Sequence, residues 1–219
     1  KGISFKQVEV NPLNKKQIAF SKEYKKVPIF VDSDGKQVND STVIMRHIER
    51  VYPEKAVFEK EESKKENETY FLNWSDDILA PALVPLIYRD FSSSWKAFAY
   101  ICEVSNFGPI TKQLIRGFGS FIMTMVAKKK RKALGVKDPG KHFELTLAFL
   151  AKELEERSFL GGDRVNAADL ANFGVLKSVQ TLEAFSFVEK NARVWNWFIE
   201  VEKAIQQGKR ETEEIISNF

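Results

Sequence analysis

Two short stretches, KKVPIFV at residues 25–31 and NDSTVIM at residues 39–45, decide the fold of the first part of this chain. The first is an apolar strand opened by Pro28, and a proline can begin a strand but cannot occupy its centre, because it has no N–H to donate. Asp34-Gly35 is typical of a tight turn, and a second, poorer strand follows it over residues 35–38. We therefore expect a short β-hairpin.

The second stretch predicts a helix directly after this hairpin. Asp40 is a favourable N-cap residue, so the helix is expected to begin at Ser41. Its apolar residues recur at helical spacing and share one face: Val43, Ile44, Ile48 and Val51. Pro53 is expected to end it.

This order of elements resembles the glutathione-binding half of glutathione-transferase-like proteins. The resemblance implies that the Val27-Pro28 bond is cis and presents main-chain groups to glutathione, and that Asp40 and Ser41 hold the glutamyl end of the tripeptide. An X-Pro bond is cis in only about 5–6% of cases, so the dipeptide alone does not predict this geometry. The predicted glutathione-binding residues are thus Val27, Pro28, Asp40 and Ser41.

The remainder of the chain predicts two domains. Ile3 to Val10 alternates like a strand, Asn11-Pro12 is a turn, and Asn14 caps a short helix over residues 15–20. We place a thioredoxin-like domain at residues 1–53, a charged linker without periodicity at 54–66, and an all-helical domain at 67–219. The fold class is therefore α+β followed by all-α: a partial thioredoxin-like domain and a helical glutathione-transferase-like domain.

The helical half has several clear signals. A helix over residues 69–88 is expected to kink or break at Pro81 and Pro85. Residues 94–104, 111–134, 138–157 and 194–205 also have helical spacing. Residues 166–169, Asn-Ala-Ala-Asp, form a capping box, in which the side chain at each end binds the backbone N–H of the other residue. We interpret this box as a folding device rather than a functional site.

At finer grain the chain is similar to the membrane-associated prostaglandin E synthase type 2 family. The matching stretches lie at residues 8–12, 24–29, 39–41, 74–77, 88–89, 108, after 126, 159–162, 168–171, 174–176 and 183–185. This resemblance implies a dimeric protein that is linked to mitochondrial or Golgi membranes and binds glutathione and, with it, haem. It also implies a thiol-dependent isomerisation of an endoperoxide.

The chain departs from this family in one respect. Family members begin with a strand and a helix that carries Cys-x-x-Cys, and residues 1–219 contain neither. The lone cysteine, Cys102, lies within a predicted apolar helix, where we expect it to be buried and inert, so no catalytic residue is assigned in this chain. The missing strand is central in this fold, so we expect either upstream residues or a partner chain to fill the gap.

Composition limits the other function classes. The net charge of +4 and the dispersed basic residues do not favour nucleic-acid binding, and no run is long enough to span a membrane. His47 and His142 make no metal-binding spacing, and we expect them at the surface or in capping roles. The basic run 128–132 fits haem propionates, phospholipid or an acidic partner, but equally a solvated helix end that complements the helix dipole.

Three functions remain open. The first is a glutathione-binding protein of the prostaglandin E synthase 2 type, which is a thiol-dependent isomerase if a Cys-x-x-Cys precedes Lys1. The second is a non-catalytic accessory subunit of a mitochondrial membrane complex. The third is a general glutathione transferase. The expected location is accordingly a mitochondrial membrane, the Golgi or the cytoplasm, in a homodimer or a larger assembly.

Overall fold

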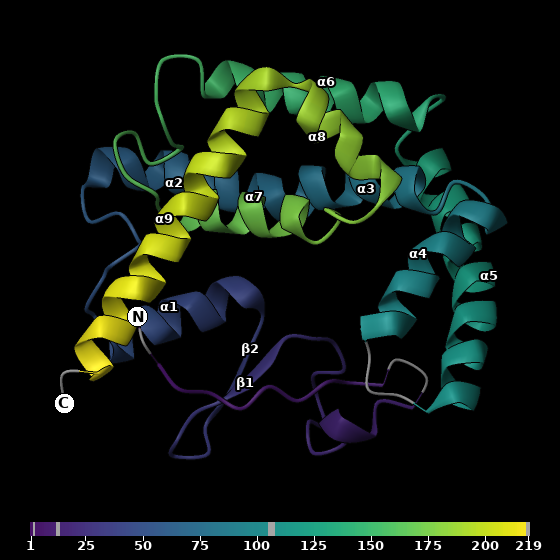
Figure 1. Cartoon of the computed structure of the whole chain (residues 1–219), viewed down its shortest axis with the longest axis horizontal. Coiled ribbons are helices and arrows are strands. Elements are labelled where there is room, and N and C mark those ends of the chain that lie inside the picture. Colours follow the sequence, from purple (N-terminus) through teal and green to yellow (C-terminus); the bar gives the residue numbers. More distant parts are fainter. Residues whose placement is uncertain (2, 12–13, 105–107, 218–219) are drawn as a thin grey trace.

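The computed structural model describes residues 1, 3–11, 14–104 and 108–217, and it contains one small hairpin and a large helical body (Figure 1). Strands β1 (Ile29–Val31) and β2 (Gln37–Asn39) pair antiparallel, with Ile29 opposite Asn39. Gly35 in the connecting turn has φ of 81°, a conformation that glycine adopts without steric cost. Helix α1 (Ser41–Val51) follows at once. The predicted hairpin and helix are therefore confirmed.

The first predicted strand is wrong. Residues 3–10 form no β-ladder with any other described residue, and Phe5 and Val8 are exposed. Alternation alone cannot hold a strand, because its N–H and C=O groups need a neighbouring strand as a partner. After this segment, Asn14 accepts a hydrogen bond from the backbone N–H of Lys16, which begins a 3₁₀ turn, η1 (Lys16–Ile18). Pro12 of the predicted turn lies outside the described residues.

Helices make up the second half of the chain, as predicted. In order they are α2 (Glu62–Trp74), the π-helical turn η2 (Ser75–Leu79), α3 (Ala80–Ile87), α4 (Phe91–Val104), α5 (Pro109–Ala133), α6 (Pro139–Glu153), α7 (Ala167–Lys177), the 3₁₀ turn η3 (Glu183–Phe185), α8 (Ser186–Lys190) and α9 (Ala192–Ser217). In Figure 1, α2, α3 and α7 run through the middle of the body, α6 lies above them, and α4 and α5 form one edge. The arrangement is thus a small N-terminal sheet of two strands followed by a helical body, in the order that the sequence predicts.

The predicted helix over residues 69–88 is one helical run with a local change of winding. It begins earlier than expected, at Glu62, and widens into the π-helical turn before Pro81, which lies in the first turn of α3. Proline is tolerated there because the first N–H groups of a helix have no partner within it. Pro85 lies within α3, which continues to Ile87, so neither proline ends the run.

The core lies in the helical half. Phe71, Phe143, Trp197 and Phe198 are fully buried and share a cluster with many aliphatic side chains. Burying one large apolar side chain contributes about 1.5–3 kcal/mol, so this cluster supplies most of the stability of the chain. From the hairpin and α1, by contrast, Met45 reaches this cluster only as a half-buried neighbour.

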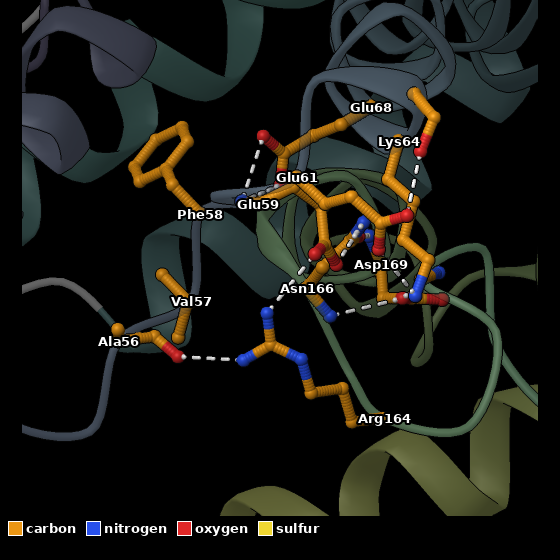
Figure 2. Close-up of polar contacts among 12 residues, drawn as sticks. Ala56, Val57, Phe58, Glu59, Glu61, Lys64, Glu68, Arg164, Asn166 and Asp169 are labelled. Atoms are coloured by element: carbon orange, nitrogen blue, oxygen red, sulfur yellow. Dashed lines mark hydrogen bonds and ion pairs between the residues drawn. The ribbon is translucent and has the colours of Figure 1, made fainter.

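The capping box at the start of α7 is confirmed, and it belongs to a larger buried polar cluster (Figure 2). The Asp169 carboxylate accepts hydrogen bonds from the backbone N–H groups of Leu160 (2.8 Å), Gly161 (3.1 Å) and Asn166 (3.1 Å). It also accepts one from the indole N–H of Trp197, at 2.7 Å. Burial raises the pKa of Asp169, and these four donors offset part of that rise. The cluster thus joins the loop before α7, α7 and α9.

The segment predicted as a charged linker is held against this cluster. Glu59 is buried and pairs with Arg164 at 3.0 Å, while its backbone N–H donates to Glu68 (Figure 2). Burial raises the pKa of the Glu68 carboxyl, and the charge of Glu59 adds to the effect. The backbone N–H of Ala167 donates to the carbonyl of Val57 at 2.9 Å. Residues 57–59 therefore pack against the helical half, whereas the domain boundaries of 53 and 67 stay predictions.

Candidate functional site

The hairpin brings the two halves of the predicted site together. The Val27-Pro28 bond is cis, as the resemblance implies. In the register of the hairpin Ile29 faces Asn39, so Pro28, just before β1, and Asp40, just after β2, lie at the same end of the ladder. Residues that face each other across an antiparallel pair have Cα atoms about 4.5–5.5 Å apart. The cis bond and the start of α1 are therefore neighbours.

The loop before the cis bond is fixed by side-chain hydrogen bonds. Ser21 is buried, and its hydroxyl donates to the carbonyl of Tyr24 at 2.6 Å. Gln37 of β2 donates from its amide to the Ser21 hydroxyl (2.9 Å) and to Asn39 (2.7 Å). Because Gln37 belongs to the hairpin, these contacts tie the approach to Val27 to the sheet itself.

Val27 and Ser41 present main-chain and hydroxyl groups that the protein does not use. Among the described residues, no hydrogen bond is formed by the backbone N–H or carbonyl of Val27, nor by the hydroxyl of Ser41. Both residues are exposed. Polar groups in this state are free to bind a ligand, and the N–H groups at a helix start favour an anion.

Asp40 has an unusual backbone conformation and uses only part of its carboxylate. One oxygen, Oδ1, accepts from the backbone N–H groups of Thr42 (3.0 Å) and Val43 (3.3 Å), and this caps α1. Its φ of 74° is a region that non-glycine residues avoid, and such a residue costs about 1–3 kcal/mol. No described residue donates to the second oxygen, Oδ2, so it is free for a cation.

The sequence did not reveal that Asp76 belongs beside this site. Asp76 lies in the π-helical turn, and burial raises the pKa of its carboxyl, with further contributions from the negative charges of Asp40 and Asp77. Two carboxylates from different halves of the chain thus share one negative region. The stretch 74–77 is part of the family resemblance, but only the fold brings Asp76 within electrostatic range of Asp40. π-helical turns are frequent at functional sites.

The prediction that His47 lies at the surface or in a cap is wrong. His47 is buried, its Nε2 contacts the Asp32 carboxylate at 2.6 Å, and its Nδ1 contacts Arg50 at 3.2 Å. The hydrogen bond with His47 lowers the pKa of Asp32. This pair joins α1 to the turn of the hairpin, because Asp32 follows β1. His142, by comparison, is half-buried in the first turn of α6.

Cys102 is buried in α4, as predicted. It is only 7% exposed, and its thiol donates to the carbonyl of Lys112 at 3.3 Å. A thiol in this position is not presented to a ligand. Within the described ranges, no group of histidine, cysteine and carboxylate side chains has the arrangement of a metal site, and no helix is long and apolar enough to cross a membrane.

Comparisons with known proteins agree with this geometry. The family model described as glutathione S-transferase, N-terminal domain, matches residues 1–56, and that of the C-terminal domain matches residues 119–203. Prostaglandin E synthase 2 of Mus musculus is 27% identical over 249 residues, and that of Danio rerio is 26% identical over 247. These matches cover 94% and 93% of this chain, which spans 65% of the length of each relative.

Solved structures show the same fold. A glutathione S-transferase from Rhodospirillum rubrum F11 aligns with a TM-score of 0.55 at 16% identity, over 86% of this chain and 71% of that one. A mutant of poplar glutathione transferase F1 aligns with a TM-score of 0.54 at 16% identity, over 89% and 75%. The chain therefore belongs to the glutathione-transferase-like proteins and is a homologue of prostaglandin E synthase 2.

Proposed function

We propose that this chain binds glutathione at the end of the hairpin and serves a thiol-dependent isomerisation of the prostaglandin E synthase 2 type. The observation that carries the proposal is the cis Val27-Pro28 bond beside the capped start of α1. The relatives named prostaglandin E synthase 2 support the reaction class.

The chemistry of glutathione matches the groups of the site. An extended peptide can pair its backbone with the unused N–H and carbonyl of Val27. Its glutamyl carboxylate suits the hydroxyl and helix N-terminus at Ser41. Its ammonium group suits the shared negative region of Asp40 and Asp76. Each polar end of the tripeptide therefore has a partner of complementary charge.

Glutathione bound here would bring a thiol, which is what the isomerisation of an endoperoxide requires. The thiol of Cys102 is buried in α4 and does not replace it. The residues described above bind and orient the tripeptide, which carries a thiol of its own. Isomerisation consumes no net electrons, so no further oxidant or reductant is needed.

Other expectations from the resemblance stay predictions. They are haem binding, a homodimer or a larger membrane-associated assembly, and a mitochondrial or Golgi location. The alternative of a non-catalytic subunit gains no support from relatives that carry the name of a synthase.

Isothermal titration of the chain with reduced glutathione tests the binding step. We expect one site, weakened about 10-fold in Ser41→Ala and in Asp76→Asn, since a hydrogen bond to a charged group is worth about 1.5–3 kcal/mol at most. Asp163→Asn is the control, because Asp163 is an exposed carboxylate in the loop before α7, outside the proposed site. Absence of binding, or equal weakening in the control, would contradict the proposed site.

The reaction class needs a separate assay. Prostaglandin H2 is incubated with the chain, with and without glutathione, and conversion to prostaglandin E2 is followed by mass spectrometry. We expect glutathione-dependent conversion that falls in Ser41→Ala. Binding without conversion would keep the glutathione site and reject the isomerase.

A further inference from the structure

Helix α5 turns most of its larger apolar side chains away from the protein, and Ile115 is the buried exception. Its outward side chains include Ile110 (78% exposed), Phe118 (62%) and Phe121 (61%). Four more are also exposed: Leu114, Ile122, Met125 and Val126. With about 100° between successive residues, all seven lie within about 80° of the direction of Phe118, so they form one continuous stripe. We call these seven residues the α5 stripe.

On the inner face of the same helix the buried side chains are Ile115, Ser120, Thr124 and Ala127, of which only Ile115 is large. Ser120 and Thr124 are buried there, and Thr124 exchanges a hydrogen bond with Ser94 of α4 at 2.8 Å. A Cβ atom on Gly119 would lie 2.6 Å from the ring of Phe98, so α4 and α5 approach closely at this point. Most of the apolar surface of α5 thus faces outward, whereas a surface helix usually turns its apolar face inward. A stripe of this size marks an interaction surface.

The charge of α5 indicates what covers the stripe. Its 25 residues include seven lysines and arginines and no aspartate or glutamate. Lys128, Lys129 and Lys132 are exposed, and the same helical angles place them on the face of the stripe, at its C-terminal end. Among the described residues they form no ion pair. Arg131 instead bonds to the carbonyls of Val136 and Lys137 after the helix.

A second copy of this chain fits this face poorly. A two-fold axis across α5 would bring two helices together, each with positive charge at both ends of the stripe (Lys112 and Arg116, then 128–132) and no acidic residue between. An apolar layer beneath a negatively charged surface satisfies both features, and this is the arrangement of a membrane with anionic lipids.

We propose that the α5 stripe and its three lysines dock on an anionic phospholipid surface. The apolar side chains enter the boundary between headgroups and acyl chains, while the lysines stay at the level of the phosphates. The edge of the molecule formed by α4 and α5 would then face the bilayer (Figure 1). This proposal is independent of the glutathione site, which includes no residue of α5.

Flotation of the purified chain with lipid vesicles tests the proposal. We expect binding to phosphatidylcholine vesicles that contain about 30% phosphatidylserine, little binding to phosphatidylcholine alone, and loss of binding as salt is raised. Each lysine near such a surface contributes about a five-fold gain, so the triple variant Lys128→Gln, Lys129→Gln, Lys132→Gln should bind roughly 100-fold more weakly. The triple variant Lys60→Gln, Lys141→Gln, Lys152→Gln removes the same charge elsewhere and should bind normally.

Two single variants test the apolar part. Phe118→Ser should weaken vesicle binding about 10-fold, whereas Leu145→Ser on α6 should not, although Leu145 and Phe118 are each 62% exposed. Neither side chain supports the core, so both variants should keep the thermal unfolding midpoint of the parent. Sedimentation velocity without lipid completes the test.

Three results would overturn the proposal. They are failure to bind anionic vesicles, equal binding by the variants of α5 and their controls, and a dimer that Phe118→Ser converts to monomer. The last result would assign the stripe to a second copy of the chain. Binding that depends on the lysines, the stripe and phosphatidylserine together supports the membrane surface.

Discussion

Asp169 in the helical half and Asp40 in the hairpin half differ in burial and in how many hydrogen bonds their carboxylates accept. Asp169 is fully buried and accepts four hydrogen bonds. Asp40 is exposed and uses one oxygen to cap α1, with a strained backbone, next to a residue, Val27, whose main-chain groups have no partner within the described chain. Polar groups whose hydrogen bonds are all made within the protein stabilise the fold, whereas groups without such partners are available to a ligand. The difference separates the structural polar residues from those we assign to glutathione.

The largest expected effect on stability comes from replacing Asp169, whose carboxylate accepts four hydrogen bonds. Asp169→Ala would leave four donors unpaired in the interior, at about 1–3 kcal/mol each, so we expect a loss of about 4 kcal/mol or more in the free energy of unfolding. Urea unfolding followed by circular dichroism measures it. If this variant does not fold, Asp169→Asn, which keeps one acceptor oxygen, should show an intermediate loss.

The exposed Asp163, in the loop before α7, provides the control for this variant. Asp163→Ala should change the unfolding free energy by less than about 0.5 kcal/mol. A loss for Asp169→Ala no larger than that of Asp163→Ala would show that the buried cluster is not what holds this half together.

Replacing each of two glycines by alanine should change the stability by a smaller amount, and the two changes should have opposite signs. A Cβ on Gly161 would lie 2.5 Å from the carbonyl oxygen of Arg164, so Gly161→Ala must shift the backbone of the cluster and should cost about 1–3 kcal/mol. Gly174, inside α7, has nothing within 4 Å of such an atom, so Gly174→Ala should stabilise by about 0.5–1 kcal/mol. Thermal unfolding compares them. Equal shifts of both variants would contradict the close packing at Gly161.

Much of the fold could be predicted from local signals. The hairpin, the cap at Asp40 and the capping box at 166–169 depend on neighbouring residues, and each is confirmed. The segment 3–10 was misjudged because a strand depends on a partner that its own alternation does not supply.

The parts that depend on distant contacts could not be predicted. His47 was misjudged because its burial depends on Asp32, fifteen residues away, and Glu59 was assigned to a charged linker because its partner Arg164 lies 105 residues later. That the charge of Asp40 acts on Asp76 could be seen only from the whole fold. Of the site itself, the sequence therefore supplied the residues of the hairpin half but not the carboxylate from the helical half.

The N-cap residues Asp40 and Asp138 allow a second comparison, because they make the same hydrogen bonds with different backbone conformations. Asp40 and Asp138 each accept, through Oδ1, from the N–H groups of the second and third residues of a helix, but φ is 74° at Asp40 and −122° at Asp138. Glycine replaces such a cap at a cost of only a few tenths of a kcal/mol and relieves a positive φ. Asp40→Gly should therefore be stabilising by about 0.5–1 kcal/mol, and Asp138→Gly slightly destabilising.

These two variants should also differ in binding. Asp40→Gly removes a carboxylate from the proposed ammonium site and should bind glutathione about 10-fold more weakly, whereas Asp138→Gly should bind normally. A more stable protein with weaker binding is the signature of a strained functional residue. Calorimetric titration of both variants gives the answer, and unchanged binding in Asp40→Gly would remove Asp40 from the site.

The smallest expected effect is on pH dependence. The pKa of Asp32 is lowered in the folded chain by its hydrogen bond with His47, so its contribution to stability is complete above the unfolded value of about 3.9 and is lost as the pH falls through the folded value. The difference in unfolding free energy between the parent and Asp32→Asn should therefore shrink from pH 6 towards pH 2. A difference that stays constant over this range would contradict the stabilised Asp32 carboxylate.

The most direct test of the central claim is a titration of the isotope-labelled chain with glutathione, followed by amide chemical shifts. We predict saturable shifts at the amides of Val27, Ser41 and Thr42 and around Asp76, with the resonances of the cluster at Asp169 unchanged. Shifts that fall elsewhere, or no shifts at all at millimolar glutathione, would contradict the assignment of this site.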